Sequence, residues 1–323
     1  MSDWSQLSVL VTGGTGFVGA NLVRRLLEDG HDVHLFVRRG YRDWRIKNLL
    51  PHLQLHTVDL LDASSLSDAV ADARPAWVFH LAAYGAYSWQ DRLNEAIQTN
   101  FLGTLNLLEA CRAAGFESFI HAGSSSEYGP KAHPSTEDDL PEPDSAYALA
   151  KVSATSFCRY TGWRFGLPVH TLRLYSVFGP YEEPGRLIPA LVVHGLRGQL
   201  PPLAHPATAR DFIFTEDVTR IFLQIAASAA SLPPGEIYNL GSGRQTTLRE
   251  AVEVARDVLG IAAEPTWESM SPRPWDTPTW LADNTKLRAT GWEPQFDFRA
   301  GFLRTVEWFR GNGELVREVY VAM

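Results

Sequence analysis

Cysteine is almost absent from this chain of 323 residues, which contains only Cys111 and Cys158. Neither cysteine lies in a CxxC pair or in a spacing typical of metal ligands, so a disulfide framework and a thiolate metal site are both excluded. We therefore expect two reduced thiols, no bound metal and a cytoplasmic protein.

Long apolar runs and an excess of positive charge are also missing. No segment is long enough to cross a bilayer, and Met1 to Gln6 lacks the basic region and apolar stretch of a signal peptide. The formal net charge of −8 argues against a general nucleic-acid or anionic-membrane surface. It leaves room for a local basic pocket that binds an anionic substrate.

The composition that remains is that of an ordinary globular protein, with 45% hydrophobic and 20% charged residues. The chain has no repeats and no low-complexity tract. A chain of this length can bury a large core, and we predict one compact protein with two lobes.

The stretch from Val9 to Ala20 combines a short apolar run, three glycines and the start of a helical pattern. Gly13 allows a sharp turn, Gly16 lets the backbone approach a pyrophosphate, and Gly19 lets the helix pack closely against the strand. N–H groups at the helix start then face the phosphates. The order of strand, turn and helix favours dinucleotide binding over an ordinary glycine-rich turn.

No carboxylate lies at the end of the second predicted strand, His31 to Val37, where an NAD site usually has one for the ribose 2′-hydroxyl. Arg38 and Arg39 follow instead, and Arg42 and Arg45 extend the basic region. Guanidinium groups pair with phosphate, so the pattern favours a 2′-phosphate and hence NADP, with NAD as the alternative. The competing interpretation is that these arginines are solvated at a strand end.

A third strand is predicted from Leu53 to Leu60. Asp59, near its end, can accept a hydrogen bond from an adenine amino group. The alternative is that Asp59 or Asp62 caps the helix that begins near Ser64.

A fourth strand is predicted from Ala76 to Ala83, and its small end at Ala82 and Ala83 leaves room for a flat ring or a ribose. The aromatic loop from Tyr84 to Gln90 follows at the carboxyl edge of the sheet, where ligands bind in such folds. Its aromatic side chains either line a substrate pocket or pack the loop. A long helix is then predicted from Asn94 to Ala114.

Tyr147 and Lys151 are four residues apart, which places them on one face of a predicted helix. A lysine cation near a phenol favours the phenolate and lowers the tyrosine pKa from about 10, so Tyr147 can act as an acid or base near neutral pH. Ser124 follows a fifth predicted strand, Phe119 to Gly123, and can hydrogen-bond the same substrate oxygen. A Tyr-x-x-x-Lys pair alone is a weak signal, but here it follows a dinucleotide turn and a serine-rich strand end in order.

These motifs together resemble the extended short-chain dehydrogenases/reductases, and more narrowly the nucleotide-sugar epimerases, dehydratases and ketoreductases. The segments that carry the resemblance are Thr12 to Gly19, His80 to Ala83, Ser124 to Gly129, Tyr147 to Lys151, Leu172 to Pro180, Arg210 to Val218, Tyr238 to Gly243 and Gly291 to Pro294. The resemblance implies an α/β fold, with a doubly wound parallel sheet (Rossmann) and a smaller C-terminal α/β substrate-binding lobe. It implies a dinucleotide-binding domain over residues 1–175 and a sugar-nucleotide-binding lobe over residues 176–323, although the chain is expected to cross between lobes more than once.

The resemblance also implies roles for single residues. Tyr147 is the acid/base, Lys151 also binds the nicotinamide ribose, and Ser124 takes the family's Ser/Thr place, with Ser125 as the alternative if the loop is shifted by one. The expected cofactor contacts are Gly13, Gly16, Phe17, Val18, Gly19, Arg38, Arg39, Asp59, Leu60, Leu81, Ala82, Ala83, Asn100, Tyr147 and Lys151.

For the substrate, Arg210 matches a family residue that often contacts the diphosphate. Arg186 and Arg273 are either further contacts to the anionic substrate or surface arginines. Ser176 stands where many members have an asparagine near the substrate phosphates. Tyr84 and Ser125 complete the expected substrate contacts.

Three reactions fit this set of residues. The 4,6-dehydratases of this family resemble one another in having an Asp-Glu pair directly after the Ser/Thr. This chain has Ser125 and Ser126 at those two positions, and Glu127 lies one place further on. An epimerase retains NAD, whereas Arg38 and Arg39 favour an exchangeable NADPH. We therefore predict NADPH-dependent reduction of a keto group, at C4 of a nucleotide-linked 4-keto-6-deoxyhexose, with an epimerase as the alternative and a dehydratase third.

A non-catalytic dinucleotide sensor is a different class of protein on the same scaffold. Such proteins commonly lose the tyrosine or the lysine, and both are present here. The resemblance further implies a homodimer, formed by residues 94–114 and 147–165 as a four-helix bundle. From the negative net charge and the lack of a long apolar run, we expect neither a nucleic-acid nor a membrane partner.

Overall fold

The chain is described in a computed structural model, which covers residues 6–85, 90, 92–271, 277 and 279–321. It divides into two compact units. The first unit contains residues 1–129, 137–174 and 219–239, and the second contains residues 130–136, 175–218 and 240–323.

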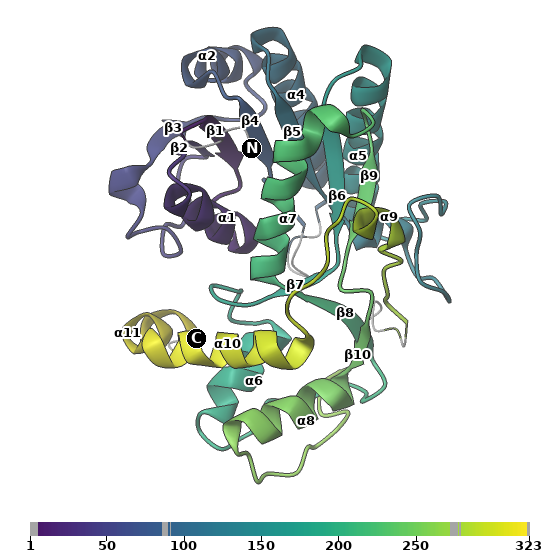
Figure 1. Ribbon diagram of the computed structural model, residues 1–323. Coiled ribbons are helices and arrows are strands. Elements are labelled where there is room, and N and C mark those ends of the chain that lie inside the picture. Colours follow the sequence, from purple (N-terminus) through teal and green to yellow (C-terminus); the bar gives the residue numbers. More distant parts are fainter. Residues whose placement is uncertain (1–5, 86–89, 91, 272–276, 278, 322–323) are drawn as a thin grey trace. The chain divides into compact units, whose positions relative to one another are not determined.

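A seven-stranded sheet forms the centre of the first unit, in the order β3-β2-β1-β4-β5-β6-β9 (Figure 1). The strands are β1 (Ser8–Thr12), β2 (Asp32–Val37), β3 (Gln54–Thr57), β4 (Trp77–His80), β5 (Ser118–Ser124), β6 (Val169–Leu174) and β9 (Ile237–Leu240). The pairings from β3 through β6 are parallel. The strand order reverses between β1 and β4, where ligands bind in doubly wound sheets, and the predicted fold class is confirmed.

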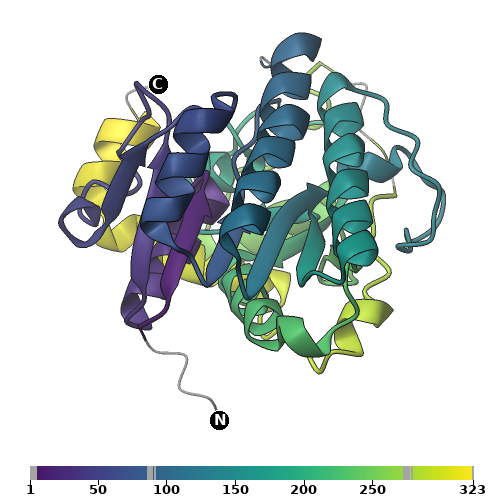
Figure 2. The same ribbon diagram turned by 90° about the horizontal axis from the view of Figure 1, so that it is seen from above.

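Helices cover both faces of this sheet (Figures 1 and 2). One face carries α2 (Ala63–Ala73), α4 (Gly103–Ala114) and α5 (Ala146–Phe165), and the other carries α1 (Phe17–Glu28) and the first-unit part of α7 (Thr215–Ser228). Because both faces are covered, β1, β4 and β5 are almost entirely buried and read as apolar runs. The shorter helical turns are η1 (Leu50–His52), α3 (Leu93–Ala96), η2 (Ile97–Leu102), η3 (Ser125–Tyr128) and η4 (Ala229–Ser231).

The second unit contains a three-stranded sheet in the order β10-β8-β7, made of β7 (Ser176–Phe178), β8 (Ala209–Phe214) and β10 (Gln245–Thr247). β7 runs parallel to β8, and β10 runs antiparallel to it. Three helices, α6 (Leu187–Gly195), α8 (Leu248–Leu259) and α10 (Phe298–Gly311), pack on one another. The remaining helical turns are α9 (Thr285–Arg288), α11 (Gly313–Val316) and η5 (Arg317–Val321).

Buried Asp211 on β8 ties distant loops of the second unit together. Its carboxylate accepts hydrogen bonds from the backbone N–H groups of Ser242 at 2.7 Å, Gly243 at 3.1 Å and Ala282 at 3.1 Å. Burial raises the pKa of Asp211 to about 6, and these hydrogen bonds oppose the rise. The residue after Arg210 is therefore a structural anchor for this sheet.

Two predicted strands end earlier than expected. β3 ends at Thr57 rather than at Leu60, and β4 ends at His80 rather than at Ala83. Pairing between β1 and β4 stops with Thr12 opposite His80, because the chain turns away at Gly13. The residues that consequently lie in loops rather than in strands are Asp59, Leu60, Leu81, Ala82 and Ala83.

The long helix predicted from Asn94 to Ala114 is interrupted. It consists of α3, the π-helical turn η2 and α4, and Asn100 lies in the π-helical turn. In the second unit, α8 begins at Leu248, because Thr247 and Glu250 form a capping box at its start. Among the described residues, no helix is long and apolar enough to cross a membrane.

Candidate functional site

The glycine turn between β1 and α1 is tightly enclosed by backbone. Gly13 has a φ of 72°, and a Cβ at this position would lie 2.5 Å from the backbone of Leu81 and Ala82. A Cβ on Gly19 would collide with the carbonyl group of Gly13. Both positions therefore exclude any side chain, which explains two of the three glycines in the motif.

The start of α1 fits an anion such as a pyrophosphate. Gly16 is its N-cap, no described side chain caps it, and its first turn holds no acidic residue. The first N–H groups of a helix have no partner within the helix and carry partial positive charge. Phe17 and Val18 form this first turn and are half-buried.

Basic side chains gather after β2. Arg38 and Arg39 follow the strand and are exposed. Arg45 is only 5% exposed, and its guanidinium lies 4.2 Å from the centre of the Trp44 ring. Arg45 Nη1 also donates to the carbonyl of Thr15 at 3.4 Å, so a buried cation lies directly beside the glycine turn.

Asp59 and Asp62 have different surroundings. Asp62 is the N-cap of α2 and accepts a hydrogen bond from Ser65 N at 3.2 Å. Asp59 is exposed and accepts one from Leu61 N at 3.0 Å. Asp62 is therefore the helix cap, and the contact of Asp59 with adenine stays a prediction. The contact of Leu60 with the cofactor also stays a prediction. The carbonyl oxygen of Leu60 accepts a hydrogen bond from the side chain of Asn106 on α4.

A chain of buried hydrogen bonds runs from the end of β1 to the loop after β4. Thr12 Oγ1 lies 2.6 Å from His80 Nδ1, and His80 Nε2 lies 2.8 Å from Thr104 Oγ1. Thr104 donates its own hydroxyl hydrogen to Asn100 O at 2.6 Å, so it accepts from His80, and the imidazole proton belongs on Nε2. The Asn100 amide then bonds both the N–H and the carbonyl of Tyr84 at 2.7 Å.

This chain has two consequences for the site. Burial lowers the pKa of His80 to about 3, so the ring is neutral and its two nitrogens have fixed roles. Asn100, expected as a cofactor contact, is fully buried and orients the backbone of Tyr84. Its contact with a cofactor therefore stays a prediction.

The end of β5 carries a serine turn closed by a buried carboxylate. Ser124 Oγ accepts from Ser126 N at 3.2 Å, and Glu127 accepts from Ser124 N at 2.8 Å. Glu127 also accepts from Thr155 Oγ1 at 2.9 Å and pairs with Arg173 Nε at 2.8 Å. Because Glu127 and Arg173 are both buried and paired, the role of this carboxylate is to stabilise the fold.

Tyr147 and Lys151 lie one turn apart at the start of α5, whose N-cap Ser145 accepts from the backbone. Tyr147 is half-buried, and the backbone of Gly85 packs against it. Lys151 is only 2% exposed. Its Nζ donates to Ala122 O at 2.5 Å, and burial lowers the pKa of Lys151 to about 8.

The first unit thus brings several predicted residues together. α5 packs against β5, which places the Lys151 ammonium beside the backbone just before Ser124. Ser124 and Ser125 are both buried at the end of this strand. The glycine turn meets Leu81 and Ala82 at the ends of β1 and β4.

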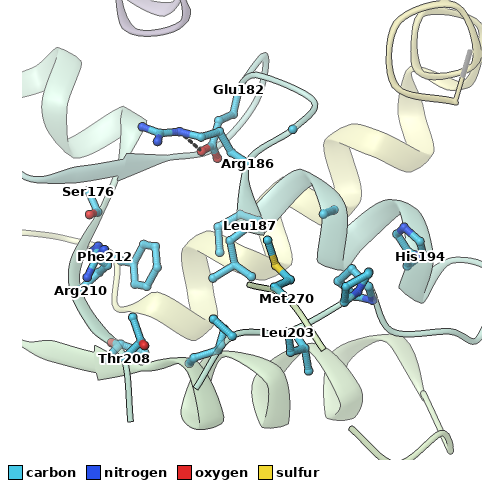
Figure 3. A pocket seen from close by; sticks show the side chains of 18 of the residues that line it. Ser176, Glu182, Arg186, Leu187, His194, Leu203, Thr208, Arg210, Phe212 and Met270 are labelled. Carbon is cyan, nitrogen blue, oxygen red and sulfur yellow. Dashed lines mark ion pairs between the residues drawn. The ribbon is translucent and has the colours of Figure 1, made fainter. Parts of the chain in front are cut away.

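The second unit contains a pocket of about 420 Å³ (Figure 3). Ser176 and Arg210 lie on one side of it, and His194 lies at the opposite end. Arg210 donates to the carbonyl of Ala209 at 2.7 Å, and exposed Arg186 lies 3.9 Å from Glu182. The pocket therefore combines two guanidinium groups with apolar walls. Arg273 and residues 86–89 of the aromatic loop lie outside the described residues.

Sequence reasoning missed three features of the first unit. His121 on β5 lies 3.2 Å from Lys151 Nζ through its Nε2 atom. In the sequence, Arg45 belongs to a basic region, and Glu127 stands three residues after Ser124; neither pattern predicts that these side chains are buried. A histidine inside the apolar run of β5 was the one available signal for His121, and burial of the other two depends on distant contacts.

Comparison with known proteins agrees with this geometry. A family model described as "NAD dependent epimerase/dehydratase family" matches residues 9–241. A UDP-glucose 4-epimerase from Mycolicibacterium smegmatis is 31% identical, with 95% of this chain and all of that protein aligned. A dTDP-glucose 4,6-dehydratase from Neisseria meningitidis serogroup B is 29% identical over 94% of this chain and 93% of that protein.

A solved structure is similar over the same extent. The UDP-glucose 4-epimerase of Thermus thermophilus in complex with NAD superposes with a TM-score of 0.81 and 30% identity. The match covers 94% of this chain and 99% of that chain, so both units are included.

Proposed function

Because this chain belongs to the NAD-dependent epimerase/dehydratase family, we propose that it is an oxidoreductase acting on a nucleotide-linked sugar. The observation that carries the proposal is that Tyr147 and buried Lys151 lie one turn apart on α5, with the Lys151 ammonium bonded to the β5 backbone two residues before Ser124. In this proposal residues 1–175 bind the dinucleotide and residues 176–323 bind the sugar nucleotide.

We assign the proton transfer to Tyr147. The Lys151 ammonium, one turn along the helix, favours the phenolate and also hydrogen-bonds the nicotinamide ribose. Ser124 Oγ accepts from Ser126 N, so the O–H of Ser124 can donate to the sugar oxygen. Tyr147 then gives a proton to that oxygen in reduction, or takes one in oxidation.

The cofactor is assigned to the carboxyl ends of β1 and β4. The N–H groups at the start of α1 hold the pyrophosphate, and Gly16 at the N-cap lets the backbone approach it. Gly13 and Gly19 allow the close backbone packing that forms this turn. When bound, a nicotinamide cofactor supplies or accepts the hydride. The further proposed contacts are Phe17, Val18, Asp59, Leu60, Leu81, Ala82, Ala83 and Asn100.

We propose NADPH as the cofactor and reduction of a keto group at C4 as the reaction. The support is Arg38, Arg39 and above all Arg45, a buried guanidinium beside Thr15. A cation at this point suits a 2′-phosphate, whereas an NAD site usually has a carboxylate here.

The substrate diphosphate is assigned to the pocket of the second unit. Arg210 and Ser176 are the proposed contacts there, and Arg186 becomes one if it leaves Glu182. Arg273 remains a proposed contact, as do Tyr84 and Ser125 of the first unit.

The relatives favour a second candidate, which is epimerisation with a retained NAD. Dehydration is less well supported. It needs a free acid–base pair after Ser124, and Ser125 and Ser126 occupy those positions. The next residue, Glu127, is committed to Arg173.

We also propose a homodimer formed through the α4 and α5 region. Leu149, Tyr160 and Trp163 are exposed on α5, and their spacing puts them on one face. Sedimentation equilibrium of the purified protein tests this proposal, and a monomer at micromolar concentration would contradict it.

Mass spectrometry of the nucleotide released from denatured protein is the decisive first experiment. NADP or an empty site favours the reductase, and keto-sugar nucleotides are then screened with NADPH. Stoichiometric NAD favours the epimerase and overturns the NADPH proposal. Tyr147→Phe is expected to abolish turnover while cofactor affinity is retained, and full activity in this variant overturns the assigned mechanism.

Substitution of Arg45 tests the cofactor proposal directly. Arg45→Ala is expected to weaken NADPH binding about tenfold or more, because a phosphate loses a charge-assisted hydrogen bond. NADH binding is expected to change little. Arg42→Ala, at an exposed arginine nearby, is the matched control. Equal loss of both cofactors in Arg45→Ala contradicts the 2′-phosphate contact.

A further inference from the structure

Lys151 is a buried cation with an unusual second acceptor. Its Nζ lies 2.5 Å from Ala122 O and 3.2 Å from His121 Nε2, and both acceptors belong to β5. The side chain is 2% exposed, so water contributes little to its solvation. A buried ammonium needs protein acceptors to remain charged.

His121 can serve only as an acceptor toward this ammonium. The residue is fully buried, and burial and the Lys151 charge hold its pKa well below the usual value. The neutral ring then offers the lone pair of Nε2 to Lys151 and carries its proton on Nδ1. Nδ1 is buried and has no hydrogen-bond partner among the described residues.

The neighbouring ring of His80 cannot take over this role. Its centroid lies 5.5 Å from that of His121, but both of its nitrogens are engaged by Thr12 and Thr104. An unpaired N–H on His121 costs stability. A leucine or phenylalanine at this position would pack without that cost, but it would give Lys151 no acceptor in place of Nε2.

We infer that His121 is a positioning residue for Lys151, whose ammonium it holds beside Tyr147 by accepting a hydrogen bond at Nε2. The inference rests on the function proposed above for Tyr147 and Lys151. The charged and titratable groups around this pair are His80 on β4, Glu127 on η3, Cys158 on α5 and Arg173 on β6. Among these, Glu127 raises the pKa of Lys151, but it is itself paired with Arg173.

Loss of this acceptor has a defined electrostatic effect. Without His121 Nε2, the ammonium keeps its hydrogen bond to Ala122 O but loses its second acceptor, and its charged form is less stable. The pKa of Lys151 then falls below its value of about 8. A neutral lysine no longer favours the Tyr147 phenolate, so activity is lost at a lower pH than in the wild-type protein.

Three variants separate this role from simple packing. His121→Leu removes the acceptor, and His121→Gln keeps an acceptor oxygen in a side chain of similar length. His170→Leu is the matched control, because His170 is also a fully buried histidine and lies on β6, the strand next to β5.

The readout is the titration of Lys151 by NMR of lysine labelled at Cε and Nζ. The chain has only four lysines, Lys47, Lys131, Lys151 and Lys286, and Lys151→Arg assigns the resonance. We expect His121→Leu to lower the Lys151 pKa by about one unit, with His121→Gln and His170→Leu close to wild type. The alkaline limb of the kcat profile should move by the same amount, with little change in KM.

An unchanged Lys151 titration in folded His121→Leu overturns the inference, and so does the same shift in His170→Leu. If His121→Leu does not fold, His121→Gln is used in its place. Because the glutamine keeps an acceptor oxygen, a Lys151 pKa more than one unit below wild type in that variant also overturns the inference. The titration needs no substrate. If the wild-type protein transforms no nucleotide sugar, the proposed function fails while the titration still tests His121.

Discussion

Gly85 controls the space available to Tyr147 in the first unit. It has a φ of 97°, and a Cβ added there would lie 2.9 Å from Tyr147 Cβ. Gly85→Ala is expected to displace the Tyr147 side chain and to reduce kcat about tenfold or more, because small misplacements of a reacting group slow the chemistry strongly. Steady-state kinetics with saturating cofactor measures the effect.

Gly30→Ala is the control for Gly85→Ala. Gly30 also has a positive φ, of 83°, but no atom lies within 4 Å of the added Cβ. Both variants should lose about 1–3 kcal/mol from backbone strain, and only Gly85→Ala should lose activity. Equal activities in the two variants would show that the Gly85 contact does not position Tyr147.

Glu127 is predicted to be a structural carboxylate. Glu127→Gln leaves the buried guanidinium of Arg173 without its counterion, and we expect the free energy of unfolding to fall by about 3–5 kcal/mol. Glu109→Gln breaks an exposed pair with Arg112 and should leave the free energy of unfolding close to the wild-type value. Urea denaturation compares them. If Glu127→Gln instead has wild-type stability but no turnover, this carboxylate is catalytic, and dehydration becomes the favoured reaction.

At the scale of elements, the π-helical turn η2 determines where the loop after β4 can lie. It presents Asn100 toward Tyr84, and the Asn100 amide bonds both backbone groups of that residue at 2.7 Å. Asn100→Ala is expected to lower the free energy of unfolding by about 2–4 kcal/mol, since two hydrogen bonds are lost and buried groups are left unpaired.

Asn106→Ala is the comparison for Asn100→Ala. Asn106, on α4, donates one hydrogen bond to Leu60 O, so its removal should cost about 1 kcal/mol. Urea midpoints of the two variants, with the slopes checked for two-state behaviour, give the difference. An Asn100→Ala protein as stable as Asn106→Ala would contradict the importance assigned to the Tyr84 contact.

The elements that the sequence predicted well are those with local causes. The glycine turn and α1 follow from the spacing of Gly13, Gly16 and Gly19, and each glycine has its own steric reason. The ends of the strands depend on pairing partners, so β4 stops at His80 only because β1 turns away at Gly13. The π-helical turn likewise depends on the contact between Asn100 and a loop 16 residues earlier in the chain.

The candidate site could be predicted in part for the same reason. Tyr147 and Lys151 share a helix, and their spacing alone places them on one face. The hydrogen-bond acceptors of Lys151 lie on β5, about 30 residues earlier in the chain, and no local sequence pattern predicts them. Burial of Arg45 against Trp44 and Thr15 is also a product of tertiary packing, which charge patterning does not reveal.

For the molecule as a whole, three buried histidines of the first unit make stability depend on pH. Burial lowers the pKa of His80 to about 3 and that of His170 to about 4, and holds that of His121 well below its usual value. In the unfolded chain a histidine has a pKa of about 6.5. Below this pH the unfolded chain binds more protons than the folded chain, so the free energy of unfolding falls as the pH decreases.

Each of these histidines should contribute a slope of about 1.4 kcal/mol per pH unit once it is fully protonated in the unfolded chain. The three histidines together contribute a loss of about 4 kcal/mol between pH 6 and pH 5. Asp211, whose pKa burial raises to about 6, offsets part of this loss, because its folded carboxyl takes up a proton over the same range. Urea unfolding at pH 7.5, 6.5 and 5.5 measures this dependence. His170→Leu removes one proton-binding group and should reduce the slope by about one third, because the other two histidines are unaffected. An unchanged slope in that variant would mean that His170 is already protonated in the folded chain. A stability that rises on acidification would mean the same for all three rings.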